Sequence, residues 1–259
     1  MFDRLQRPFL TVETGEAYQP VRLTYKTDNK EEFVKSIEKL DCIQKNAANN
    51  SWSWYWQGEC KDQHFASVDS YKRNSETPLR LGTLIFRDNA IFLNLPSFKR
   101  ACLAVPFFNK VISDSRFLKI VSADFINKVF ALDERLPHGF TELFKDEELD
   151  RILNERISDY EKVKTHCEQA STAEEAFSIL SKYTKTEGQK KLPYAERYMF
   201  DLSKEEDMDV VFLAFYIYLR GREMVAIKRW FGQTGYTLSD AADETVEKVF
   251  GGIGLDLLD

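Results

Sequence analysis

Apolar and polar residues alternate in some parts of the chain and recur at helical spacing in others. Residues 20–27 alternate, which predicts a half-buried strand. Residues 31–40 place their apolar side chains on one helical face, and Asp28 or Asn29 can cap that helix. Residues 51–56 are aromatic and alternate again, which predicts another strand. The chain therefore opens with a strand, a helix and a strand.

The following segments add a hairpin and a second helix. Residues 81–95 contain two apolar runs around Asp88-Asn89, a pair that tolerates the backbone of a tight turn. Residues 98–112 predict a helix, which Pro106 would kink or divide in two. Residues 117–121 predict one more strand. This order favours an α+β fold in which an N-terminal mixed or antiparallel sheet carries helices on one face.

The second half of the chain has mainly helical patterns. Breaker residues at 133–140 predict a boundary between an α+β domain of residues 1–132 and a mainly helical, acidic domain of residues 141–259, although the two can pack as one unit. Residues 146–168 predict a long amphipathic surface helix, and residues 238–250 predict the last helix. The fold expected is therefore a sheet followed by a mainly helical C-terminal part.

Two further helices are expected between these. Ser171 begins one of them, in a segment with acidic residues that suit a first turn. Residues 210–219 are ten apolar residues in succession, preceded by a capping box at residues 203–206. We expect a central helix that is buried on most sides, although its aromatic and β-branched content also suits an interior strand.

The two halves differ in charge. Residues 1–140 carry 20 Lys and Arg against 17 Asp and Glu, whereas residues 141–259 carry 16 against 25. The acidic half repels nucleic acid and anionic membranes at long range and attracts a basic protein surface. Four scattered cysteines and the lack of an apolar run of membrane-spanning length predict a soluble, cytoplasmic protein.

Few residues suggest catalysis. Cys60 and His64 are four positions apart, with Cys42 upstream, but zinc needs four ligands or three and a water. On a strand the Cys60 and His64 side chains are about 13 Å apart, too far for proton transfer. Only a helical turn would bring them together. We expect no metal and no cofactor. The sequence favours a protein that is not an enzyme.

The most distinctive feature is an alternating stripe of Trp52, Trp54 and Trp56, which a strand directs to one side. The stripe is either core or an exposed aromatic platform for a protein or ligand, and the one-sided sheet favours core. Residues 224–250 also have the pattern of a helix-turn-helix motif. A basic face near its start consists of Arg220, Arg222, Lys228 and Arg229. The helix that would enter a DNA groove is acidic, which makes nucleic-acid binding unlikely.

These observations lead to one favoured function and two alternatives. The favoured function is a non-enzymatic binding or regulatory module that acts through protein–protein contacts. The first alternative is an enzyme or small-ligand-binding protein with a site at the junction of the two halves. Residues for such a site or a partner surface are the three tryptophans with Cys60, His64 and His138. The second alternative is nucleic-acid binding through Arg220–Arg229.

Overall fold

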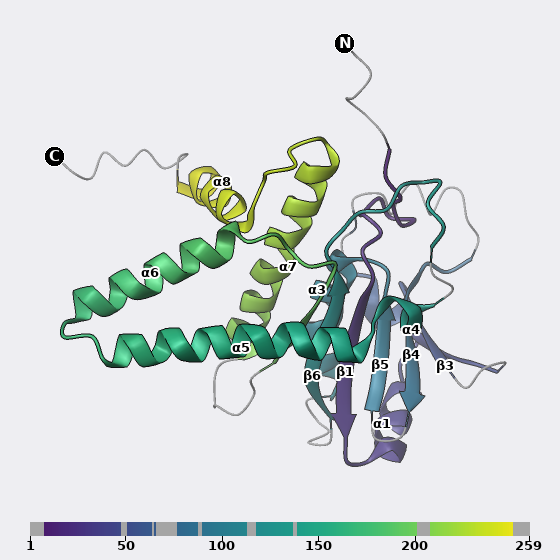
Figure 1. The fold of residues 1–259 in the computed structure, drawn as a ribbon. Coiled ribbons are helices and arrows are strands. Elements are labelled where there is room, and N and C mark those ends of the chain that lie inside the picture. Colours follow the sequence, from purple (N-terminus) through teal and green to yellow (C-terminus); the bar gives the residue numbers. More distant parts are fainter. Residues whose placement is uncertain are drawn as a thin grey trace, which may run out of the picture.

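A computed structural model gives the structure of the protein (Figure 1). It describes residues 8–47, 51–63, 65, 77–87, 90–112, 118–136, 139–200 and 208–250. The fold is α+β, as the sequence predicts: an antiparallel sheet and its helices come first, and a mostly helical part follows. The predicted capping box, the tip of the hairpin, His64 and His138 lie outside the described residues.

The described strands form one seven-stranded antiparallel sheet of order β2-β3-β4-β5-β1-β6-β7. They are β1 (Val21–Thr27), β2 (Ile43–Asn46), β3 (Ser51–Tyr55), β4 (Arg80–Arg87), β5 (Ala90–Leu95), β6 (Leu118–Ile126) and β7 (Ala195–Met199). The predicted hairpin is confirmed, because β4 and β5 pair from Arg87 and Ala90 inward. The sequence patterns missed β2 and β7.

Most of the described helices lie where the sequence predicts them, but α4 was not predicted and α7 extends to Trp230, well beyond the predicted residues 210–219. They are α1 (Lys30–Ile37), α3 (Phe98–Ile112), α4 (Phe140–Leu143), α5 (Asp146–Glu168), α6 (Ala173–Gln189), α7 (Met208–Trp230) and α8 (Leu238–Phe250), with a 3-10 turn η1 (Gly58–Cys60). Asn29 caps α1 by accepting a hydrogen bond from the Glu32 backbone N–H. The helix α3 continues through Pro106, so division into two helices is wrong.

The core lies between the sheet and the helices on one of its faces. Strand β1 directs Val21 and Leu23 into this core, and both are fully buried. Helix α1 adds Phe33, and helix α3 adds Phe108, whose ring packs edge-on against Trp54. Among the described residues, none of the helices is long and apolar enough to cross a membrane.

Strand β7 joins the second half of the chain to the sheet of the first half. It pairs with β6, so that Arg197 lies opposite Asp124. Helices α5 and α6 extend from the sheet as a helical hairpin, and the end of α6 returns to α8 (Figure 1). Helix α7 packs against α3 on the covered face of the sheet. The helical half therefore contributes β7, the edge strand of the sheet, and its helices are attached to the sheet through this strand.

Candidate functional site

The helices of the second half expose large apolar side chains to solvent. Eight such side chains lie on three helices: Ile157 and Tyr160 on α5, Phe177 and Leu180 on α6, and Val210, Leu213, Tyr216 and Ile217 on α7. Phe177 is the most exposed, at 73%. Single exposed apolar residues are ordinary, but a concentration of them marks an interaction surface. We call these eight residues the apolar surface.

Four residues of the apolar surface lie on the side of α7 that faces away from the core. Phe215 and Leu219 face the core and are buried, but Val210, Leu213 and Ile217 recur at three- and four-residue spacing on the opposite side and are exposed. Ile217 is 61% exposed. The prediction of a helix over residues 210–219 is confirmed, whereas the expectation that it is buried on most sides is wrong. Only one side of α7 meets the sheet and α3.

Helix α6 is widely exposed to solvent. None of its 17 residues is buried. It packs on α5 along one side, and near its end Gly188 lies against Ser239 of α8. Helices in proteins gain most of their stability from packing an apolar face, because isolated helices of this length are marginal in water. The exposed apolar face of α6 is therefore suited to cover by another molecule.

A groove separates α7 from α8. It has a volume of about 680 Å³, and Tyr216 and Ile217 of the apolar surface lie along it. Its other lining is mostly apolar or small: Tyr218, Gly221, Met224, Leu238, Ala241, Ala242 and Thr245, with Arg220 and Arg222. The groove thus continues the exposed stripe of α7, and we call it the α7–α8 groove.

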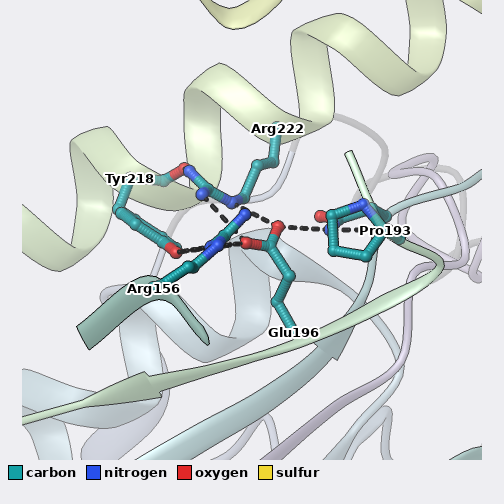
Figure 2. A network of polar contacts seen from close by, with 6 residues as sticks. Arg156, Pro193, Glu196, Tyr218 and Arg222 are labelled. Atoms are coloured by element: carbon teal, nitrogen blue, oxygen red, sulfur yellow. Dashed lines mark hydrogen bonds and ion pairs between the residues drawn. The ribbon is translucent and has the colours of Figure 1, made fainter. Parts of the chain in front are cut away.

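A buried carboxylate anchors the helical half to the sheet (Figure 2). Glu196 of β7 is fully buried and accepts hydrogen bonds from the Arg222 guanidinium of α7 at 2.8 and 3.2 Å. Arg156 of α5 pairs with the same carboxylate and donates to the Tyr218 hydroxyl at 3.1 Å. Asn127 donates a further hydrogen bond to it. One side chain therefore connects the sheet edge with both α5 and α7.

Two arginines share the single carboxylate of this network. Burial disfavours the ionised form of Glu196, but Arg222 and Arg156 outweigh burial and lower its pKa. Burial also disfavours the charged form of Arg156, and Glu196 outweighs that effect and raises its pKa. Burial raises the pKa of Tyr218 to about 12, so its hydroxyl stays protonated and can donate. The network is therefore ionic at neutral pH.

The neighbouring residue of β7 makes a second anchor on the other side of the strand. The Arg197 guanidinium lies 2.6 Å from Asp124 of β6 and 2.7 Å from Asp146 of α5, and it also contacts Asp150. Burial opposes the charge on Arg197, but the hydrogen bonds from its guanidinium to Asp124 and the other carboxylates raise its pKa. The start of α5 is thereby fixed to the sheet.

A second cavity lies within the first half of the chain, next to the start of α4. Its volume is about 810 Å³. It is lined by the N-terminal segment, by β4 and β5, and by the start of α4, including Tyr18, Thr83, Asn94 and Phe140. Arg100, which also lines it, donates to the Arg80 carbonyl at 2.8 Å and to Glu13 at 3.0 Å. This arginine serves first to hold the N-terminal segment against β4.

The tryptophan stripe lies largely in the core. Trp52 and Trp54 are buried, and the Trp54 ring stacks on Phe107 with 5.4 Å between ring centroids. Trp56 follows the end of β3 and is partly buried against the same core. Trp52 and Trp54 are therefore core residues and do not form an exposed aromatic platform.

Cys60 is buried next to Cys42. The Trp54 indole N–H donates to the Cys60 sulfur at 2.9 Å. A hydrogen bond with Cys60, together with burial, raises the pKa of Cys42, which keeps that thiol protonated and a poor nucleophile. The described residues contain no group of three His, Cys, Asp or Glu side chains that could hold a metal ion.

The four cations of the basic face have partners within the protein. Arg222 is buried on Glu196, and Arg220 pairs with Glu223 three residues on. Lys228 lies 2.8 Å from Glu244, and Arg229 donates to the Tyr236 carbonyl at 2.8 Å. Arg222, Lys228 and Arg229 thus hold α7 to its neighbours, whereas the Arg220 pair lies within α7.

Sequence reasoning missed both the Glu196 network and the apolar surface. A charged residue inside a short segment resembles a loop, and Arg156 and Arg222 are 40 and 26 residues away. No protein-family model, curated protein or solved structure matches the chain. The function is therefore argued from the geometry alone.

Proposed function

We propose that the protein is a non-enzymatic binding module that acts through protein–protein contacts at the apolar surface of α5, α6 and α7. The observation that carries this proposal is the exposure of eight large apolar side chains on these three helices. Such exposure is costly in water and is typical of a surface that another protein covers.

The composition of the apolar surface also supports this function. Three of its side chains, Tyr160, Phe177 and Tyr216, are aromatic, and aromatic residues dominate interface energetics. The other five are aliphatic and are 44% to 61% exposed.

The anchoring of the helices also supports it. The Glu196 and Arg197 contacts fix the start of α5, and Arg222 ties α7 to the same strand. Two of the three helices that carry the apolar surface are thus held in place before a partner arrives. A surface that is already ordered loses less conformational entropy on binding.

Co-purification from the native host tests the proposal. At moderate ionic strength, we expect the wild-type protein to recover a stoichiometric protein partner, and the double variant Phe177→Asp/Leu180→Asp to lose it. The matched control is Leu132→Asp, because Leu132 is 60% exposed but lies outside the three helices. Recovery of no partner under any condition, or equal recovery by the double variant, would refute this function.

A second candidate is small-ligand binding in the second cavity, within the first half of the chain and next to the start of α4. The cavity volume of about 810 Å³ lies in the range of ligand sites, and Tyr18, Asn94 and Phe140 offer polar and aromatic groups. A thermal-shift screen with common metabolites tests it, because a ligand at 100 times its Kd stabilises by about 2.7 kcal/mol. A shift that Thr83→Trp abolishes would support the cavity as the site.

A further inference from the structure

The second cavity, next to the start of α4, lies against the face of the sheet opposite the apolar core. Leu84 of β4 and Leu93 of β5 form a cross-strand pair that is buried in the core. The adjacent pair, Thr83 and Asn94, points to the opposite face, because side chains alternate along a strand. Thr83 and Asn94 both line the second cavity, so their side chains are neighbours at its wall.

This wall carries hydrogen-bond donors that a ligand can use. The Asn94 side-chain oxygen accepts a hydrogen bond from the Arg22 guanidinium at 3.3 Å, which leaves the amide NH₂ group to donate elsewhere. Asn94 is only 8% exposed, yet this NH₂ group has no partner among the described residues. The hydroxyl groups of Thr83 and Tyr18 also have no partner in the part of the chain that the structure describes. Burial raises the pKa of Tyr18, so its hydroxyl is protonated and can donate.

Arg80 gives the cavity a positive charge. Of the described residues that line it, Glu13, Arg80 and Arg100 are charged. Arg100 pairs with Glu13 at 3.0 Å and lies 3.8 Å from Glu16, which is outside the lining. Arg80 is exposed, and its guanidinium has no ion pair or hydrogen bond within the described ranges. Its N–H groups are therefore available to an anion, and a guanidinium matches the geometry of a carboxylate.

The rest of the lining suits an apolar ligand body. The apolar lining includes Leu10, Val12, Ile85 and Pro96. The rings of Tyr18 and Phe140 add surfaces on which an aromatic ring can pack. The volume of about 810 Å³ is sufficient for a small organic molecule.

We infer that the second cavity binds a small organic carboxylate that also carries a carbonyl group and an aromatic or aliphatic body. The carboxylate pairs with Arg80, the carbonyl accepts hydrogen bonds from Thr83 and Asn94, and the body packs on Phe140. The inference rests on the second candidate function, small-ligand binding, and specifies the chemistry of the ligand. The single charge of Arg80 matches a monoanion better than a phosphate monoester, which carries nearly two negative charges at neutral pH.

Hippurate and its neutral twin hippuramide test the inference with the full chain. Hippurate has a carboxylate, an amide carbonyl and a benzene ring, and hippuramide replaces only the carboxylate with a primary amide. Isothermal titration calorimetry measures both affinities. We expect hippurate to bind about tenfold more tightly or better, because only hippurate offers a charged acceptor to Arg80. Its affinity should fall as salt is added, because Arg80 is exposed.

Variants place the binding in the cavity. Arg80→Met removes the charge, so the affinity for hippurate should fall by about tenfold while that for hippuramide is unchanged. The matched control is Arg87→Met, which should bind like the wild type, because Arg87 is exposed at the other end of β4 and does not line the cavity. Thr83→Val removes a hydroxyl and should weaken both compounds equally, since both carry the carbonyl. Circular dichroism confirms that each variant folds.

Three outcomes would overturn the inference: no binding of hippurate, equal binding of hippurate and hippuramide, or wild-type binding of hippurate by Arg80→Met. Tighter binding of phenyl phosphate than of hippurate would also overturn it, because the cavity would then select a phosphate. Each of these leaves ligand binding in the cavity standing, provided that the metabolite screen gives a shift that Thr83→Trp abolishes. A flat screen would remove the second candidate function itself.

Discussion

At the scale of single residues, Glu196 connects strand β7 with the helices α5 and α7. It is fully buried and receives two arginines from separate helices. Removal of one member of a buried ion pair costs more than the pair contributes, because the remaining charge keeps its desolvation penalty. Its replacement therefore tests whether the network holds the helical half in place.

We expect Glu196→Gln to lower the free energy of unfolding by about 3 to 5 kcal/mol, because Arg222 and Arg156 lose their counter-charge. Urea denaturation followed by circular dichroism measures this change. Glu155→Gln is the matched control: Glu155 also pairs with an arginine, Arg151, at 2.7 Å, but both side chains are about 60% exposed. A loss of similar size in both variants would contradict a special role for Glu196.

The pH dependence of stability separates two buried glutamates. The pKa of Glu196 is lowered below 4.5, so its contribution is present above that pH and is lost as pH falls through the folded-state pKa. Burial raises the pKa of Glu223, with Arg220 and Lys99 opposing and Glu16 adding to the shift. Its contribution is present below pH 4.5 and is lost as pH rises through the higher folded-state pKa.

Urea titrations between about pH 2 and 7 test these signs. The stability difference between wild type and Glu196→Gln should grow as pH rises. The difference between wild type and Glu223→Gln should change in the opposite direction. Parallel slopes in the two variants would show that at least one of the two assigned pKa directions is incorrect.

At the scale of elements, α6 is ordered mainly by its contact with α5. With no buried residue, its backbone hydrogen bonds open without disturbing the core. We expect hydrogen exchange in α6 to be faster by at least tenfold than in α3, which packs on the sheet. Mass spectrometry of exchanged peptides measures both helices. Equal protection of α6 and α3 in the isolated chain would contradict this account.

Some helix boundaries follow from local patterns, whereas the end of α7 at Trp230 lies well beyond the predicted residues 210–219. The spacing of apolar residues and the acidic first turn define α5 at Asp146–Glu168, as expected. The exposed side of α7 could not be predicted, because ten apolar residues in succession do not reveal which side meets the core. Strand β7 was missed for a related reason, since Glu196 is buried only because Arg156 and Arg222 come from distant helices.

At the scale of the whole molecule, the two halves share one sheet. Strand β7 comes from the second half and pairs along β6 of the first. The anchors on Glu196 and Arg197 then carry this connection into α5 and α7. The helical half is therefore joined to the first half by a strand of the shared sheet and not by a linker alone. Its position depends on the sheet staying folded.

This coupling predicts a single unfolding transition for the wild-type chain. Three of the four tryptophans, Trp52, Trp54 and Trp56, lie in the first half, so their fluorescence reports on the sheet, whereas far-ultraviolet circular dichroism is dominated by the long helices. We expect the urea midpoints of both signals to coincide. In Glu196→Gln/Arg197→Ala the anchors are lost, and the helical signal should fall first. Separate midpoints in the wild type would instead show that residues 1–132 and 141–259 unfold as independent domains.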